Sequence, residues 1–195
     1  MWIKNQALDG KYVRLEPLVM QHVSALQEAV KDGEYWRLWY ASVPNPDDIS
    51  DYVAKAIEQA KQGEVAYAVI DKRINTVVGT TRYYNVDGPN KRAAIGYTWY
   101  ANSVRRSPIN TESKLLLLSN LFESYDAVAV EFNTHFFNQT SRAAIERLGA
   151  KLDGILRAHK IMKDGSLRDT AVYSIIASEW PAVRNNLEYK LYEHA

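Results

Sequence analysis

The sequence predicts an α+β domain in which helices flank a mixed, mainly antiparallel sheet, giving α/β/α layers. Three observations predict this class. Short apolar stretches typical of strands recur along the chain, and amphipathic stretches with helical spacing lie before, between and after them. In the middle of the chain, turn residues separate three consecutive strands, so we expect these three to pair as antiparallel neighbours.

The size and composition fit one soluble domain. A chain of 195 residues suits a single domain over 1–195 and can bury a sizeable core. Hydrophobic residues make up 47% and charged residues 24%, which excludes a wholly disordered chain. The formal net charge of +1 favours neither nucleic acid nor an anionic membrane as the main partner. The absence of cysteine excludes disulfides, Cys-based zinc sites and thiol nucleophiles.

The first half of the chain predicts a strand, two helices and three further strands. Alternation over 12–16 indicates a strand, and apolar positions at helical spacing indicate a helix over 19–30. Two prolines and four aromatic residues make 34–46 an irregular connection, after which Asp47 or Asp48 caps a second helix. Glycines at 33 and 63 end the two helices, and the strands that follow lie at about 65–71, 76–86 and 92–100.

The second half alternates helices and strands. Apolar spacing predicts a helix over 110–125, and a strand follows at 128–134. A helix over 138–148 is ended by Gly149. The remaining elements are strands at 150–161 and 168–176 around a turn, and an amphipathic helix from about 178 to 192.

Several kinds of active site have no residues to support them. The sequence has no nucleophile elbow, no phosphate-binding Walker loop and no dinucleotide-binding glycine pattern. The four histidines show no metal-ligand spacing, so we expect no metal site. Hydrolase, kinase and dehydrogenase functions are therefore not predicted.

The most informative stretch is a strand that leads through a short basic loop into a helix. The strand ends at Tyr100, the loop contains Arg105 and Arg106, and the helix begins near Asn110. Free N–H groups and the positive end of a helix N-terminus bind anions, and arginines strengthen such a site, so a pyrophosphate fits here. The alternative is that Ser107 or Asn110 only caps the helix and the arginines are solvated.

Motifs along nearly the whole chain point to one family. They are Val13-Arg14-Leu15-Glu16-Pro17-Leu18, Ile95-Gly96-Tyr97-Thr98-Trp99, Asn110-Thr111-Glu112-Ser113-Lys114-Leu115, the stretch 138–150, Asp164-Gly165-Ser166-Leu167-Arg168-Asp169, Tyr173-Ser174 and Glu179-Trp180-Pro181. Together they resemble the GNAT superfamily of N-acetyltransferases, in the branch that contains ribosomal-protein alanine and serine N-terminal acetyltransferases. The resemblance implies one domain with the GNAT-like acyl-CoA N-acyltransferase fold.

By this resemblance, acetyl-CoA lies in a fork between two strands and no metal takes part. One strand carries Thr98, Trp99 and Tyr100, whose backbone groups pair with the pantetheine arm and the thioester carbonyl; the other strand is 128–134. Asn138 contacts the pantetheine. The residues implied to hold the pyrophosphate are Arg105, Arg106, Ser107, Pro108, Ile109, Asn110 and Thr111.

The pyrophosphate loop departs from the family pattern. Pro108 and Asn110 stand where the family has glycines, and a proline removes one N–H that could meet a phosphate oxygen. Ser107 and Pro108 also fit an N-cap and first helical position, where that N–H has no helical partner in any case. We therefore expect CoA binding to be weakened but retained.

The catalytic groups are hypotheses. Many family members carry a tyrosine acid where this chain has Ile145, which cannot donate a proton. Ser141 matches a serine of the branch that lies near the thioester sulfur, so we assign it as the proton donor; a structural contact in the first helical turn is the alternative.

The base is less defined. Relatives often carry a glutamate where this chain has Ala94. Glu131 on the strand 128–134 and His135 after it are candidates, and for both the alternative is a solvated residue without a catalytic role. An N-terminal α-amine has a pKa of about 7.7–8.0, so a strong base is not required.

The acceptor pocket is expected to use aromatic residues and one arginine. Trp36, Trp39, Arg82 and Tyr84 are the main candidates. Tyr35, Tyr40, Tyr83 and Trp99 accompany them. The alternative for each ring is a place in the core, and for Arg82 a place in solvent.

The sequence therefore predicts an acetyl-CoA-dependent enzyme that acetylates a primary amine, either a protein N-terminus or a small amine, by direct attack. One alternative is an acyl-CoA-binding module with impaired catalysis, which Ala94, Pro108 and Ile145 favour; another is an interaction domain without cofactor. No signal peptide is visible and the longest aliphatic run is 115–118, so we expect a cytoplasmic protein. Family relatives often pair, so a homodimer is an open expectation.

Overall fold

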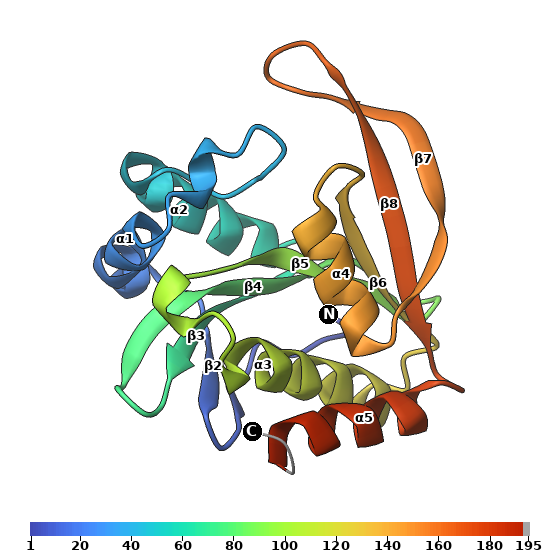
Figure 1. Cartoon of the computed structure of the whole chain (residues 1–195). Coiled ribbons are helices and arrows are strands. Elements are labelled where there is room, and N and C mark those ends of the chain that lie inside the picture. Colours follow the sequence, from blue (N-terminus) through green and yellow to red (C-terminus); the bar gives the residue numbers. More distant parts are fainter. Residues whose placement is uncertain (193–195) are drawn as a thin grey trace.

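The computed structural model describes residues 1–192 and shows helices packed on both faces of one large sheet (Figure 1). Within these residues the sheet has eight strands in the order β1-β2-β3-β4-β5-β6-β8-β7. The strands are β1 (Leu8–Asp9), β2 (Val13–Pro17), β3 (Val65–Asp71), β4 (Thr76–Asp87), β5 (Arg92–Tyr100), β6 (Ala129–His135), β7 (Lys151–Ile161) and β8 (Leu167–Ile176). Of these eight, only β5 and β6 pair in parallel; all other neighbours are antiparallel. The mixed, mainly antiparallel sheet is therefore confirmed.

The described chain has five α-helices, four that contact the sheet and a last one that packs on other helices. They are α1 (Val23–Lys31), α2 (Ile49–Ala60), α3 (Pro108–Ser119), α4 (Gln139–Leu148) and α5 (Trp180–Tyr192). Alternating side chains of β4 show how they are divided: Arg82 contacts Gln59 of α2, whereas the Tyr83 hydroxyl donates to the Leu117 carbonyl of α3. Because successive strand side chains point to opposite faces, α2 and α3 lie on opposite sides of the sheet. We call these the α2 face and the α3 face.

The structure corrects the predicted elements at their ends. β1 has two residues, too few for an alternation pattern, and was not predicted. The helix predicted over 110–125 begins at Pro108, because Ser107 caps it by accepting the Ile109 N–H, and it continues as a π-helix over Asn120–Ser124. The cap and first-position assignment of Ser107 and Pro108 is thus confirmed. Short 3₁₀ helices occupy Tyr35–Arg37 and Pro46–Asp48 within and after the irregular connection.

Candidate active site

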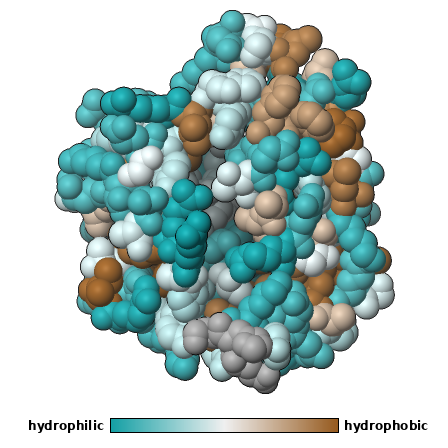
Figure 2. All heavy atoms as spheres, viewed as in Figure 1, coloured by the Kyte–Doolittle hydropathy of each residue, from teal (hydrophilic) through white to brown (hydrophobic). Residues whose placement is uncertain are grey.

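The sheet opens into a fork at its centre. β5 and β6 pair only from Arg92 opposite Ala129 to Ala94 opposite Glu131, after which the two strands separate. A cavity of about 1070 Å³ extends from the opening and is lined by β5 residues 95–100 and β6 residues 132–135, together with α3, α4 and the connection before α2. Figure 2 shows this face hollowed between the parts formed by α1 and α2 and by α4. The cavity volume lies at the upper end of the range typical of sites for small ligands and cofactors.

A bulge in β5 shapes the wall of the cavity. The register of β4 and β5 shifts between Thr80, which lies opposite Trp99, and Arg82, which lies opposite Gly96. At the shift, Tyr97 adopts a left-handed backbone conformation with φ of 50°. A bulky residue in this region is strained, and bulges that re-aim backbone groups occur next to active sites. The carbonyl of Tyr97 is held in place by the Thr80 hydroxyl at 3.1 Å.

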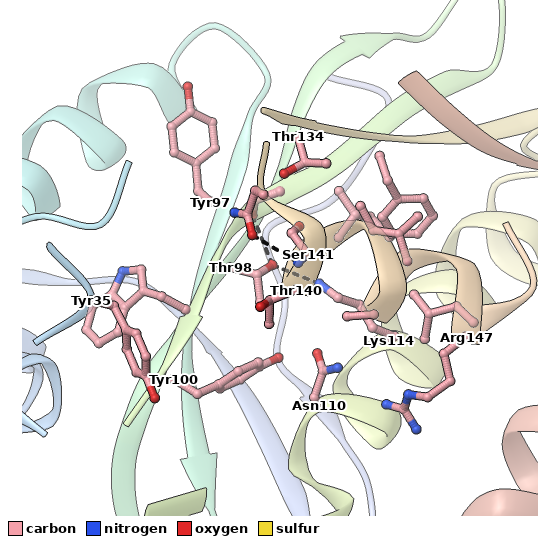
Figure 3. A pocket seen from close by; sticks show the side chains of 18 of the residues that line it. Tyr35, Tyr97, Thr98, Tyr100, Asn110, Lys114, Thr134, Thr140, Ser141 and Arg147 are labelled. Carbon is pink, nitrogen blue, oxygen red and sulfur yellow. Dashed lines mark hydrogen bonds between the residues drawn. The ribbon is translucent and has the colours of Figure 1, made fainter. Parts of the chain in front are cut away.

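One end of the cavity is built from the start of α3 and the last turn of α4. Arg106 has a left-handed φ of 58°, and Arg105 donates to the Tyr35 hydroxyl at 2.9 Å. From α4, Arg147 donates to the Thr111 hydroxyl at 3.2 Å, which brings a further cation to the α3 N-terminus (Figure 3). Six of the seven loop residues predicted from the sequence line the cavity; the seventh, Ile109, is fully buried.

The described residues that line the cavity include six cations and no aspartate or glutamate. The cations are Arg105, Arg106, Lys114, Arg147, Arg168 and Lys190. Such a wall attracts an anionic ligand and offers no carboxylate partner to a polycation. Of the six, only Arg105 and Arg106 were predicted; Arg147, Arg168 and Lys190 come from elements that the fold, not the local sequence, brings to the fork.

Lys114 is a buried amine on the α3 face. Its Nζ donates to the hydroxyls of Thr98 at 2.8 Å and Thr81 at 3.3 Å, and Figure 3 shows it pointing to Thr98. Burial lowers the pKa of Lys114 to about 7. Thr98, predicted as a cofactor contact, is therefore tied through its side chain to α3 and lines the cavity along with Trp99 and Tyr100.

The start of α4 brings the predicted donor to the cavity. Asn138 caps α4 by accepting the Ser141 N–H at 3.0 Å, and both residues line the cavity. Ile145, one turn farther along, also lines it with a buried apolar side chain. The geometry thus permits the Ser141 hydroxyl to meet a ligand, and its catalytic role stays a prediction.

The structure does not bring Glu131 to the cavity. Its carboxylate pairs with the Arg92 guanidinium at 2.7 Å across the paired part of β5 and β6, before the fork opens. The ion pair with Arg92 holds the Glu131 carboxylate away from the cavity. The structure therefore gives no support to Glu131 as the base.

His135 does line the cavity, but its lone pair is engaged. The Phe137 N–H donates to Nδ1 at 3.1 Å, so the proton of the neutral ring lies on Nε2. Burial, with a contribution from Arg168, lowers the pKa of His135 and favours this neutral form. His135 is therefore not a ready base.

None of the four predicted acceptor residues is among those that line the cavity. Trp39 packs edge-on against His135 with ring centroids 4.9 Å apart, and the Tyr84 hydroxyl accepts from Asn133 at 3.1 Å. Arg82 is 2% exposed, pairs with Glu64 at 3.3 Å and stacks on the Tyr97 ring at 4.3 Å. Neither these residues nor Trp36 line the cavity, and the solvent alternative for Arg82 is wrong because its neighbours bury it.

Loss of one loop cation is expected to weaken CoA binding. Arg106 is an exposed cation of the cavity rim, so the variant Arg106→Gln should raise the Kd for CoA about three- to tenfold. Titration calorimetry measures this, with the exposed α2 residue in Lys55→Gln as the charge-matched control. An equal Kd for Arg106→Gln and Lys55→Gln would contradict the assignment.

The comparisons with known proteins agree on one family. A model of the acetyltransferase (GNAT) domain matches residues 13–151. A GCN5-related N-acetyltransferase from Brucella melitensis is 29% identical with a TM-score of 0.89, covering 100% of this chain and 89% of its own. A protein from T. thermophilus, assigned as an acetyltransferase, is 32% identical with a TM-score of 0.85, covering 98% and 100%. No match was found among curated protein sequences.

Two more distant structures share the fold. RimL, a ribosomal L7/L12 alpha-N-protein acetyltransferase, is 20% identical with a TM-score of 0.75, covering 87% of this chain and 93% of its own. The self-immunity acetyltransferase MccE, solved with acetyl-CoA and AMP, is 19% identical with a TM-score of 0.73, covering 86% and 93%. Within residues 1–192, none of the helices has the length and apolar character that crossing a membrane requires.

Proposed function

This chain belongs to the GNAT acetyltransferase family, and from that premise we propose that it transfers an acetyl group from acetyl-CoA to a primary amine. The observation that carries the proposal is the fork between β5 and β6, with cations at one end and a strained bulge in its wall. That MccE was solved with acetyl-CoA supports the choice of donor. The acceptor class is a protein N-terminus or a small amine.

The residues of the fork fit a CoA thioester. β5 backbone groups beyond Ala94 are not paired with β6, so they are free to bind the amides of a pantetheine arm. Arg105, Arg106 and Arg147 surround the N-terminus of α3, where a pyrophosphate would be held. When bound, acetyl-CoA supplies an acetyl group activated as a thioester.

The protein then acts mainly by positioning the two substrates and polarising the thioester carbonyl, and less by proton transfer. Backbone groups at the Tyr97 bulge are fixed by the fold and act on the thioester carbonyl oxygen, where negative charge develops. The Ser141 hydroxyl donates a proton to the departing sulfur and regains one from the ammonium formed when the amine attacks, directly or through water. No carboxylate stands among the described lining residues, so the amine must arrive neutral, which suits an α-amine with a pKa of about 7.7–8.0.

Thiol release from acetyl-CoA tests the proposed function. The protein is incubated with acetyl-CoA and a panel of N-terminal peptides and small amines, and free CoA and the acetylated amine are both measured. Turnover with at least one amine supports the proposal. Tight binding of CoA without acetylation of any amine would instead favour the binding module, and absence of CoA binding would contradict both.

Removal of the Ser141 hydroxyl is expected to slow the reaction and spare binding. In Ser141→Ala the kcat should fall at least about tenfold, because the leaving thiolate loses its proton donor, while the KM for acetyl-CoA stays within about twofold. The adjacent hydroxyl removed in Thr140→Ala serves as the matched control. A kcat in Ser141→Ala equal to that of Thr140→Ala would remove the donor role.

A further inference from the structure

The cavity has a second polar end, on the α2 face of the sheet. His135 lies opposite Thr170 in the β6–β8 register, so their side chains share a face, and Arg168, two residues before Thr170, shares it too. The Arg168 Nε donates to the Thr170 hydroxyl at 3.1 Å. Burial lowers the pKa of Arg168, and the nearby hydroxyls of Tyr84 and Tyr97 oppose this.

This end is separate from the cluster of cations at α3. Tyr97 presents its ring to Arg82 and Tyr84 on the α2 face, whereas the next residue, Thr98, contacts Lys114 of α3 on the opposite face. A ligand whose phosphates lie at the α3 N-terminus thus passes through the fork before it reaches Arg168. Both ends belong to the same cavity.

The charge of Arg168 is not balanced by a neighbouring carboxylate. The adjacent Asp169 is engaged elsewhere, with the Arg157 guanidinium at 2.7 Å and the Ala158 N–H at 2.7 Å. No carboxylate of the described part of the chain forms an ion pair with Arg168. A half-buried guanidinium in this state attracts an anion.

A buried donor stands beside it. His135 is 3% exposed, and its Nε2, which carries the ring proton, has no hydrogen-bond partner within the described chain. Buried polar groups are nearly always satisfied, so the unsatisfied N–H of this cavity-lining residue calls for an acceptor. Asn133 and Tyr97 complete the same wall.

We propose that Arg168 and the Nε2–H of His135 bind an anionic group, a carboxylate or a phosphate, carried by the amine that is acetylated. The inference rests on the proposed function because it places this group on the acceptor. It makes the acceptor an amine of the amino-acid, acidic-peptide or aminoalkyl-phosphate type. A polyamine, which lacks such a group and would meet only cations, binds poorly.

Matched pairs of amines test the inference. Alanylglycine is compared with alanylglycinamide, and phosphoethanolamine with ethanolamine, so that each pair differs in one anionic group. Their binding to the complex of the protein with CoA, which cannot transfer an acetyl group, is measured by calorimetry, and acetyl transfer is measured separately. At least one anionic member should bind about tenfold or more tighter than its neutral partner. The pair with the larger preference identifies carboxylate or phosphate.

Variants on the paired strands β7 and β8 supply the test and its control. Arg168→Gln should reduce the preference to within about twofold and leave the Kd for CoA unchanged, and Arg168→Lys should restore part of it. Lys160→Gln removes an exposed cation directly opposite Arg168 in the register and should keep the full preference. Equal binding within both pairs, no binding of either anionic amine, or a preference that survives Arg168→Gln overturns the inference. Anion-selective binding without acetyl transfer to any amine would overturn the proposed function and the acceptor assignment, while the anion site at Arg168 would stand.

Discussion

Replacement of Glu112 by alanine is expected to lower the free energy of unfolding by about 2–6 kcal/mol. The Glu112 carboxylate is 1% exposed and accepts three backbone N–H groups, from Lys11 at 2.9 Å, Tyr12 at 2.7 Å and Val13 at 2.6 Å. It thereby fastens the β1–β2 turn to the first turns of α3. Each buried N–H left without an acceptor costs about 1–3 kcal/mol; alanine leaves those of Val13 and the half-buried Tyr12 unpaired, whereas that of the exposed Lys11 can reach water.

Urea unfolding of Glu112→Ala measures this loss. Glu58→Ala is the matched control, because Glu58 is an exposed α2 residue that only pairs with Lys61; its effect should stay below about 1 kcal/mol. Equal unfolding midpoints for Glu112→Ala and Glu58→Ala would show that the carboxylate does not hold the turn.

Replacement of Lys114 by methionine is expected to change how stability depends on pH. The folded pKa of Lys114 is about 7, below an unfolded value of about 10.4, so between these values the unfolded chain binds more protons than the folded chain. Wild-type stability should therefore rise with pH across this window, by about 1.4 kcal/mol per pH unit from this residue alone. Below pH 7 the penalty for burying the ammonium is fully present.

The variant isolates this contribution. Methionine cannot titrate, so only wild type gains stability with pH from this site. The unfolding free energy of Lys114→Met minus that of wild type should therefore fall from pH 7.5 to pH 9.5, by about 1.4 kcal/mol per pH unit. The lost hydrogen bonds to Thr98 and Thr81 add an offset that does not vary with pH. Lys55→Met on the exposed face of α2 should run parallel to wild type. Parallel curves for Lys114→Met would mean that the amine is not buried as described.

The order and type of the main elements could be predicted because their signals are local. Helical spacing, strand alternation and the glycine that ends α4 with φ of 104° are all carried by neighbouring residues. The basic loop and helix start at Arg105 to Thr111 could also be predicted, because these residues are contiguous in the sequence. The fork between the two strands was predicted from the resemblance to GNAT enzymes. β1 was missed since two residues carry no periodic pattern.

The walls of the site depend on partners from distant elements. The sequence pattern correctly places Glu131 on a strand. Only the register with β5 shows that Glu131 forms an ion pair with Arg92 in the paired part of the two strands, outside the fork. Arg168 and Arg147 lie far from the loop in sequence, and nothing in their own surroundings marks them as cavity residues. Lys114 gives a weak signal as a lysine beside four leucines, and its low pKa follows from burial against β4 and β5.

A crystal structure of the protein with acetyl-CoA shows whether the fork between β5 and β6 holds a CoA thioester. We expect density for the pantetheine arm between Thr98–Tyr100 and Phe132–His135, with the pyrophosphate at the backbone N–H groups of Arg105–Thr111. An empty fork, or a nucleotide bound only elsewhere on the surface, would contradict it.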